Sequence, residues 1–327
     1  MITETSQNIL VTGGVGFIGS ALVPVLLSKS FHVIVIDHLS TSKMQNVEAL
    51  LSFDNFEFIR LDLLDDNKLN DVVEKCDLIF HLAANTDVRR GILNTKVDFV
   101  NNVVATRNVL ESMRKSDRCK KIIFTSSSVV YGEPLVIPTP ENYGPLKPIS
   151  LYGASKLASE ALISGYVGTF GIEAVIFRLA NVVGPLIEHG VIFDFFRKLK
   201  QSHGKYLEVL GDGNQKKSYL YIDDCINALA IGLHKFNSGL EIFNVGSDDQ
   251  VDTNTISQII IDELGLDPEI IHLSEVKDGR GWVGDIKNML LSTDKLKKTG
   301  WQINHSSKDT VSLTVKKIVE RNQNKYK

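Results

Sequence analysis

The chain has 327 residues, of which 43% are hydrophobic and 23% are charged, ordinary values for a soluble globular protein with a sizeable core. The formal net charge of −3 gives no reason to expect nucleic acid or an anionic membrane as a partner. No apolar stretch approaches the roughly 18 residues that span a bilayer. The polar start Met1–Asn8 lacks a signal-peptide pattern, so we expect a cytoplasmic protein.

Three cysteines, Cys76, Cys119 and Cys225, lie far apart in the chain. They form neither a CxxC pair nor a Cys/His metal spacing, so the sequence predicts no bound metal. An odd and sparse count suits a reducing compartment, and we interpret all three as small buried hydrophobic residues.

Short apolar runs alternate with longer segments of helical periodicity through the first half of the chain. We expect strands at Ile9–Val11, Val33–Ile36, Phe56–Ile59, Leu78–Phe80, Ile122–Phe124, Val175–Phe177 and Ile242–Val245. Helices are expected over Ser20–Lys29, Asp98–Ser116 and Tyr152–Phe170, among others. This alternation predicts an α/β fold of the Rossmann type, a doubly wound parallel sheet with helices on both faces.

The second half breaks this rhythm with short helices and glycine-rich turns such as Gly211–Gly213. We expect residues 1–181 and about 219–250 to form the sheet domain. Residues of about 182–218 and 251–327 are predicted to form a smaller C-terminal α/β lobe.

The segment Thr12–Gly19 follows the first expected strand and opens a helix, the context in which closely spaced glycines bind dinucleotides. Glycine permits the sharp turn, the approach of a pyrophosphate to the backbone, and close packing of the helix on the strand. The free N–H groups of the first helical turn favour phosphate. The predicted cofactor-binding residues here are Gly13, Gly16, Phe17, Ile18 and Gly19.

Asp37 ends the next strand, 18 residues beyond Gly19, near the spacing expected of a carboxylate that binds the adenosine ribose. A carboxylate there accepts hydrogen bonds from the ribose hydroxyls and repels a 2′-phosphate, so the predicted cofactor is NAD. Asp62, which follows the third strand, is expected to meet the adenine edge, and Leu63 is predicted to be a further cofactor-binding residue.

The sequence contains two Tyr-x-x-x-Lys matches, and this spacing places both side chains on one face of a helix. Pro145 falls inside Tyr143–Lys147, so we predict a loop there. Tyr152–Lys156 opens a proline-free helix of good helix formers. To act as a base near neutrality a tyrosine needs a pKa drop of roughly 3 units, about 4 kcal/mol, which a nearby ammonium and a positively charged nicotinamide favour.

Five motifs occur in the order seen in extended short-chain dehydrogenases/reductases: Thr12–Gly19, His81–Ala84, Ser126–Gly132, Tyr152–Lys156 and Arg178–Asn181. The chain therefore resembles the NAD-dependent epimerase/dehydratase group of that superfamily over nearly its whole length. Within it the chain is most similar to UDP-glucose 4-epimerases, especially those of the archaeal type. The resemblance implies a smaller lobe that binds a UDP-sugar, and a homodimer paired through helices like the expected Asp98–Ser116 and Tyr152–Phe170.

The resemblance also assigns catalytic roles. Tyr152 is implied as the base, Lys156 as the group that lowers the Tyr152 pKa and binds the nicotinamide ribose, and Ser127 as the hydroxyl that positions the sugar. In the family this Ser or Thr stands five residues before the glycine of a Tyr-Gly pair, here Tyr131–Gly132, which selects Ser127 over Ser128. Ser127 also lies at the carboxyl end of a strand, where open α/β sheets bind ligands.

On the cofactor side the resemblance adds Ala83 and Asn102, the latter with a role in orientation. The implied substrate-binding residues are Ser127, Asn181, Val191, Lys217, Tyr219, Arg280 and Asp285. Two positions depart from the family. Lys217 stands where arginine is usual, and Trp282 stands where a phosphate-binding arginine is often found, so we expect Arg280 to reach the same phosphates from a shifted register.

The implied reaction is a transient oxidation at sugar carbon 4 with bound NAD, followed by return of hydride to either face. Ser128–Val130 has no ionisable group where the family's 4,6-dehydratases carry an Asp-Glu pair, which favours an epimerase. Other nucleotide sugars stay open. Four residues beyond Asp285 the family places a residue whose bulk limits the substituent at sugar carbon 2, and the resemblance puts Met289 there. Methionine is pliable, so N-acetylated sugars (UDP-GlcNAc and UDP-GalNAc) are one alternative, and uronates are another. An enzyme like L-threonine 3-dehydrogenase and a non-catalytic NAD-binding protein are further alternatives.

Overall fold

The computed structural model describes residues 7–236, 239–273, 276 and 278–323. The polar start of the chain, on which the cytoplasmic prediction rests, falls mostly outside these residues. Within the described part of the chain, no helix has the length and apolar character needed to cross a membrane. The chain forms two compact units, the first from Met1–Ser126, Ala154–Phe177 and Leu229–Phe243, the second from Ser127–Gly153, Arg178–Ala228 and Asn244–Lys327.

The first unit is built on a seven-stranded sheet with the strand order β11-β6-β5-β4-β1-β2-β3. Its strands are β1 (Asn8–Thr12), β2 (His32–Asp37), β3 (Phe56–Arg60), β4 (Leu78–His81), β5 (Lys121–Ser127), β6 (Glu173–Leu179) and β11 (Leu240–Val245). Neighbours from β3 through β5 pair in parallel. Every strand predicted from the apolar runs is present, and the predicted Rossmann-type α/β fold is confirmed.

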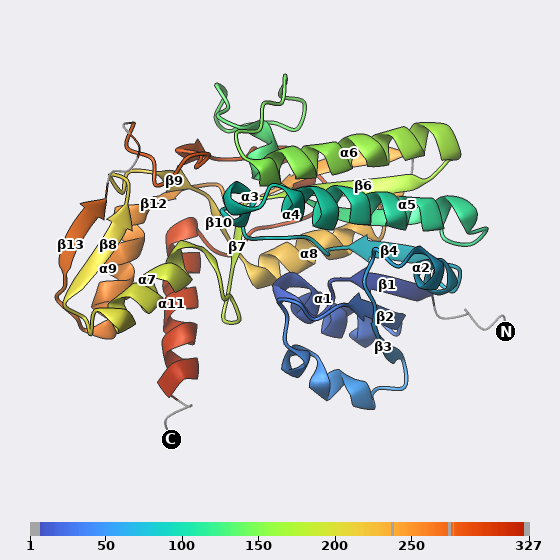
Figure 1. The fold of residues 1–327 in the computed structure, drawn as a ribbon, viewed down its shortest axis with the longest axis horizontal. Coiled ribbons are helices and arrows are strands. Elements are labelled where there is room, and N and C mark those ends of the chain that lie inside the picture. Colours follow the sequence, from blue (N-terminus) through green and yellow to red (C-terminus); the bar gives the residue numbers. More distant parts are fainter. Residues whose placement is uncertain (1–6, 237–238, 274–275, 277, 324–327) are drawn as a thin grey trace. The chain divides into compact units, whose positions relative to one another are not determined.

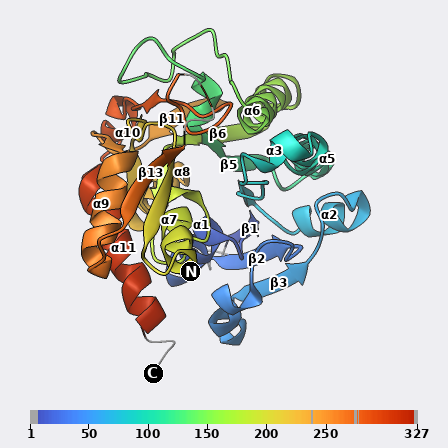
Figure 2. The same cartoon turned by 60° about the vertical axis from the view of Figure 1, so that its left-hand side comes forward.

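Helices cover both faces of this sheet because its central strands are apolar on both sides. Figures 1 and 2 show α5 and α6 over one face and α1 over the opposite one. The helices of this part of the chain are α1 (Phe17–Ser28), α2 (Asp66–Val73), α3 (Arg90–Leu93), α4 (Lys96–Asp98), α5 (Ala105–Lys115) and α6 (Leu151–Phe170), with 3₁₀ turns at Met44–Asn46 and Glu48–Ser52. A core cluster joins the sheet to α2, α5 and α6 through Leu10, Ile34, Leu69, Val109 and Ile163, among others.

One predicted helix is interrupted. The sequence suggests a single helix over Asp98–Ser116, whereas the structure has α4, then a π-helical segment Phe99–Val104, then α5. The wider turn contains Asn102, whose carbonyl oxygen accepts hydrogen bonds from the hydroxyls of Thr106 and Ser159. The prediction assumed a regular α-helical period throughout, and a short π turn is a rare local departure from that period that carries no sequence signal of its own.

The second unit contains three small sheets, ordered β10-β7, β12-β9-β14 and β13-β8. Its strands are β7 (Asn181–Val183), β8 (Tyr206–Leu210), β9 (Lys216–Lys217), β10 (Tyr219–Tyr221), β12 (Val251–Asp252), β13 (Glu269–Leu273) and β14 (Asn288–Met289). Its helices are α7 (Gly190–Gln201), α9 (Thr253–Leu264), α10 (Asp294–Lys297) and α11 (Ser307–Gln323), with a 3₁₀ turn at Ser128–Tyr131, and α8 (Ile222–Gly232) is shared with the first unit.

From the stretch 219–250, β11 joins the main sheet, while β10 pairs with β7. The predicted division into an NAD-binding domain and a sugar-binding lobe stays a prediction. The cysteines behave as expected: Cys76, Cys119 and Cys225 are free and fully buried.

Candidate active site

The turn between β1 and α1 is packed so closely that glycine is required at two positions. Gly13 has φ +68°, and a Cβ there would lie 2.8 Å from the Cα of Ala83. A Cβ on Gly19 would lie 2.5 Å from the carbonyl oxygen of Gly13. The turn therefore lies directly against the end of β4 and against the first turn of α1.

The first turn of α1 presents backbone N–H groups. Its N-cap is Gly16, which has no side chain to satisfy them. Phe17 and Ile18 begin the helix, and their amides belong to the orphan donors of a helix start. This arrangement suits a phosphate group, since the helix dipole adds positive charge at the same place.

Asp37 ties the end of β2 to the glycine turn. Its side chain is buried, and one carboxylate oxygen accepts a hydrogen bond from the Val15 amide at 3.3 Å. The other accepts from the Leu39 amide and the Ser42 hydroxyl, both at 2.8 Å. The predicted glycine and carboxylate elements of the NAD site are thus in contact, with Ser42 as a further polar group that the sequence reasoning missed.

Three other predicted cofactor residues differ in exposure. Asp62 is exposed, and its carboxylate accepts from the Leu64 amide at 3.0 Å. Leu63 is buried, with its carbonyl bonded to the Asn108 amide group. The Ala83 amide donates to the Thr12 hydroxyl at 3.4 Å. The side chain of Asp62 is therefore the one of these that solvent reaches freely.

Asn102 connects the π turn to α6. Its side chain is buried, its oxygen accepts from the Asn85 amide at 2.7 Å, and its nitrogen donates to the Ser155 hydroxyl at 2.8 Å. Ser155 lies next to Lys156 in sequence. Asn102 is thus bonded to α6 next to that lysine, and its role in orientation stays a prediction.

Tyr152 and Lys156 lie on successive turns of α6, as their spacing predicts. Tyr152 is partly exposed, whereas Lys156 is buried and its ammonium donates to the carbonyl oxygen of Thr125 at 2.8 Å. The ammonium lies 4.7 Å from the centre of the Phe124 ring. Burial lowers the pKa of Lys156 from 10.5 to about 8, against the opposing effect of Glu160. The other Tyr-x-x-x-Lys match, Tyr143–Lys147, lies in a loop, as predicted.

Ser127 ends β5 and is the partly exposed member of its serine run. Ser126 and Ser128 on either side are buried. The Ser127 hydroxyl accepts a hydrogen bond from the Val129 amide at 3.4 Å and caps the 3₁₀ turn that follows. Of the three serines, Ser127 is the one whose hydroxyl a ligand reaches most easily.

His81, at the end of β4, is a buried polar group that the sequence reasoning used only as part of a motif. Its ring nitrogens lie 2.7 Å from the Thr12 hydroxyl and 3.0 Å from the Thr106 hydroxyl. Burial, followed by the charge of Lys156, lowers its pKa to about 3. The ring is therefore neutral at physiological pH.

In the second unit, three residues implied as substrate ligands lie together. Lys217 and Asp285 form an ion pair of 2.5 Å. Arg280 donates to the backbone oxygen of Asp285 at 3.1 Å and pairs with Asp278 at 2.6 Å and Glu133 at 3.5 Å. The cationic and anionic groups of this cluster are thus already partnered within the protein, and Glu133 is an addition that the sequence did not suggest.

The remaining implied substrate residues lie on neighbouring elements of the same unit. Asn181 faces Tyr219 across the β7–β10 pair, and its side chain donates to the Ser218 carbonyl at 3.3 Å. Tyr219 is buried, and burial, with the charge of Asp285, raises its pKa. Val191 lies at the start of α7 and is half-buried.

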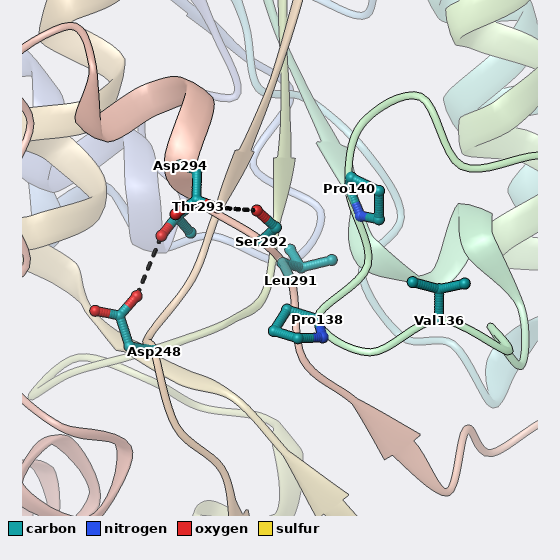
Figure 3. Close-up of a pocket in the computed structure, with 8 residues that line it drawn as sticks. All are labelled: Val136, Pro138, Pro140, Asp248, Leu291, Ser292, Thr293 and Asp294. Carbon is teal, nitrogen blue, oxygen red and sulfur yellow. Dashed lines mark hydrogen bonds between the residues drawn. The ribbon is translucent and has the colours of Figure 1, made fainter.

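A pocket of about 250 Å³ in the second unit lies apart from these residues. It is lined by Val136, Pro138, Pro140, Asp248, Leu291, Ser292, Thr293 and Asp294. Figure 3 shows the Thr293 hydroxyl bonded to Asp248 and the Ser292 hydroxyl bonded to Asp294. None of the predicted site residues belongs to this lining, so we do not assign the pocket to the reaction.

Comparisons with known proteins all find epimerases, over most or nearly all of the chain. The model of the NAD dependent epimerase/dehydratase family matches residues 9–246. A putative UDP-glucose 4-epimerase of Methanocaldococcus jannaschii is 34% identical over 319 residues, 96% of this chain and 99% of that protein. A crystal structure of a UDP-galactose 4-epimerase is 40% identical, with a TM-score of 0.85 over 96% of this chain and 99% of the other. The UDP-glucuronic acid 4-epimerase of Bacillus cereus, solved with UDP-glucuronic acid and NAD, is 29% identical, with a TM-score of 0.86 over the same shares of the two chains.

Proposed function

This chain belongs to the NAD-dependent epimerase/dehydratase family, and from that premise we propose that it interconverts UDP-glucose and UDP-galactose at sugar carbon 4. The observation that carries the proposal is the pair on α6, a partly exposed Tyr152 one helical turn from a buried Lys156. The similar proteins named UDP-sugar 4-epimerases support the reaction class.

The cofactor of the family is NAD, and the first unit has groups that fit it. The turn Gly13–Gly19 and the uncapped start of α1 would hold the pyrophosphate. Asp37 would bind the adenosine ribose, with Asp62 and Leu63 near the adenine. When bound, NAD supplies the acceptor that takes hydride from the sugar carbon and returns it to the opposite face.

The protein's own groups move the proton. Tyr152, as phenolate, takes the proton of the sugar 4-hydroxyl as that carbon is oxidised to a ketone, and gives it back when the ketone is reduced. The Lys156 ammonium stabilises the phenolate. Ser127 donates a hydrogen bond that orients the sugar oxygen. The 4-keto sugar turns over between the two half-reactions, so either epimer is released.

The nucleotide is proposed to stay bound while the sugar turns. Asn181, Lys217 and Arg280 would hold the diphosphate, and Tyr219, Val191 and Asp285 the uridine. Net binding energy then comes from the part of the substrate that does not react, which lets the keto sugar rotate without leaving.

The identity of the sugar is the finer part of the proposal. Similar proteins are named for UDP-glucose, UDP-galactose and UDP-glucuronic acid. Met289 is buried, and its backbone oxygen bonds to the Ser218 amide, so its bulk is fixed next to Lys217. We favour a sugar without an N-acetyl or carboxylate group, and propose a homodimer in the cytoplasm as its working form.

A first experiment uses no added cofactor. UDP-galactose is incubated with the purified protein and UDP-glucose is followed by chromatography, with UDP-GlcNAc and UDP-glucuronic acid in parallel. Conversion of UDP-galactose supports the proposal, and conversion of another sugar alone replaces it with that activity. Reduction of NAD by threonine, with no epimerisation, would instead favour an enzyme like L-threonine 3-dehydrogenase.

A further inference from the structure

A second charged group lies buried one helical turn beyond Lys156. Glu160 is 5% exposed on α6, and its carboxylate favours the protonated form of Lys156. The proposed reaction does not use this glutamate. A carboxylate is kept in such surroundings only when hydrogen bonds or an opposite charge compensate it.

Strand β5 provides that compensation. The Ser126 hydroxyl donates to a carboxylate oxygen of Glu160 at 2.5 Å, and the preceding carbonyl, of Thr125, accepts from the Lys156 ammonium at 2.8 Å. Consecutive residues of one strand thus hold both members of the charged pair. This fixes the orientation of each relative to the sheet.

The groups around Lys156 otherwise give limited compensation. The Phe124 ring offers its face at 4.7 Å, and His81, on β4, is kept neutral by burial and by the lysine itself. Tyr152 lies one turn earlier on the same helix. Glu160 is the group whose charge opposes the effect of burial on the lysine. Its removal would therefore favour loss of the lysine proton.

We propose that Glu160, held by the Ser126 hydroxyl, is a positioning residue that keeps the buried Lys156 ammonium charged, which rests on the proposed role of that lysine. Glu160 acts on the substrate through Lys156 and Tyr152. The alkaline limit of the reaction is then set by the pair Lys156–Glu160.

The direct test measures Lys156 itself and needs no activity. Lysine labelled with carbon-13 at Cε is titrated by NMR in the full-length protein, with the Lys156 signal assigned by its loss in Lys156→Met. We expect the pKa of Lys156 to fall by roughly one unit in Glu160→Gln. The control is Glu57→Gln, which neutralises a carboxylate on the edge strand β3 and should leave the pKa of Lys156 unchanged. An unchanged pKa in Glu160→Gln overturns the proposal.

The second measurement is the pH profile of kcat for UDP-galactose. We expect the alkaline limb to move to lower pH in Glu160→Gln, to return towards that of the parent in Glu160→Asp, and to move less in Ser126→Ala. Ser126→Ala also serves if Glu160→Gln does not fold, with Ser112→Ala as the control for loss of a buried serine. A uniform loss of rate with an unmoved limb indicates a purely structural role and contradicts the proposal. If the parent does not epimerise at all, the proposed function fails, while the titration still decides the role of Glu160.

Discussion

The Lys217 ammonium lies 2.5 Å from the Asp285 carboxylate, so two residues implied as separate substrate ligands hold each other. The other oxygen of Asp285 accepts from the Gly281 amide at 3.2 Å. The carboxylate thus connects β9 to the loop that carries Arg280. Of the positive groups proposed for the diphosphate, Lys217 is held directly by this side chain, which is 7% exposed, whereas Arg280 donates to the backbone oxygen of Asp285.

Asp285→Asn is expected to weaken binding of UDP about tenfold. The neutral amide no longer holds Lys217 by charge, and it accepts a weaker hydrogen bond from the nucleotide than the carboxylate does. Isothermal titration with UDP measures the change. Asp248→Asn is the matched control, since it removes the anion of an exposed pair with Lys297 in the same unit. Equal losses in the two variants would contradict a specific role for Asp285.

Arg280→Ala tests whether this arginine serves the diphosphate from a shifted register. We expect UDP-galactose to bind roughly ten- to a hundredfold more weakly, as on loss of charge-assisted hydrogen bonds. Arg280→Lys should restore only part of the affinity, because lysine lacks the planar fork. Adding Trp282→Arg to the alanine variant should restore part as well. Arg197→Ala, an exposed arginine paired with Asp194, is the control.

Tyr152→Phe is expected to lower kcat by about a thousandfold, since the proposed base is removed while the ring stays in place. KM for UDP-galactose should change little. The matched control is Tyr143→Phe, which removes a hydroxyl from the other Tyr-x-x-x-Lys match, in a loop. Steady-state kinetics of both variants decide the point, and full activity in Tyr152→Phe would exclude the mechanism.

Much of the first unit was predictable because its physical signals are local. Apolar runs predicted every strand of the main sheet. The spacing between the glycines and Asp37 predicted that the two belong to one site, and in the structure Asp37 accepts a hydrogen bond from the glycine turn at Val15. The strands around Lys217 were not predictable. Each is only two residues long, which is too short to show periodicity, and Val251 and Met289, which pair with Lys217, are remote in sequence. The ion pair of Arg280 with Glu133 was not predictable for the same reason, whereas its other partner, Asp278, is only two residues away in the chain.

The environment of Lys156 shows a different limit. The helix and its tyrosine partner follow from spacing, and the same rule of four residues points to Glu160. Spacing alone does not tell that Lys156 and Glu160 are both buried, or that Ser126 donates to the glutamate. Burial turns an ordinary helical charge pair into one that sets a pKa.

Asp37→Ala is expected to weaken NAD binding about tenfold or more and to reduce the preference for NAD over NADP. The carboxylate accepts from the Val15 and Leu39 amides, so the variant should also unfold at a lower temperature. Fluorescence titration of the cofactor-free protein with NAD and NADP gives both affinities. Asp54→Ala, a carboxylate before β3, serves as the control. An unchanged ratio would remove Asp37 from the ribose site.

The hydrogen bonds of His81 fix its tautomer. The Thr106 hydroxyl donates its proton to the Asn102 carbonyl at 2.6 Å, so it must accept from Nε2 of His81. Nδ1 then accepts from the Thr12 hydroxyl at 2.7 Å. A second proton would place a buried positive charge beside Lys156, and burial, followed by the charge of Lys156, accounts for the lowered pKa of His81.

This histidine should make the protein sensitive to acid. Its pKa is about 3 in the folded protein against 6.5 for the ordinary group, so the unfolded chain binds the extra proton as pH falls below 6.5. Stability from the neutral ring is complete above that pH and is lost on the way to pH 3. Between pH 7 and 4.5 we expect a loss of roughly 2 to 3 kcal/mol in the free energy of unfolding from this residue. His81→Gln, which keeps a donor and an acceptor without titrating, should show a correspondingly smaller loss in urea titrations at the two pH values. His234→Gln, at an exposed histidine, should retain the full loss. The same acid sensitivity in His81→Gln and the parent would show that His81 is not its source.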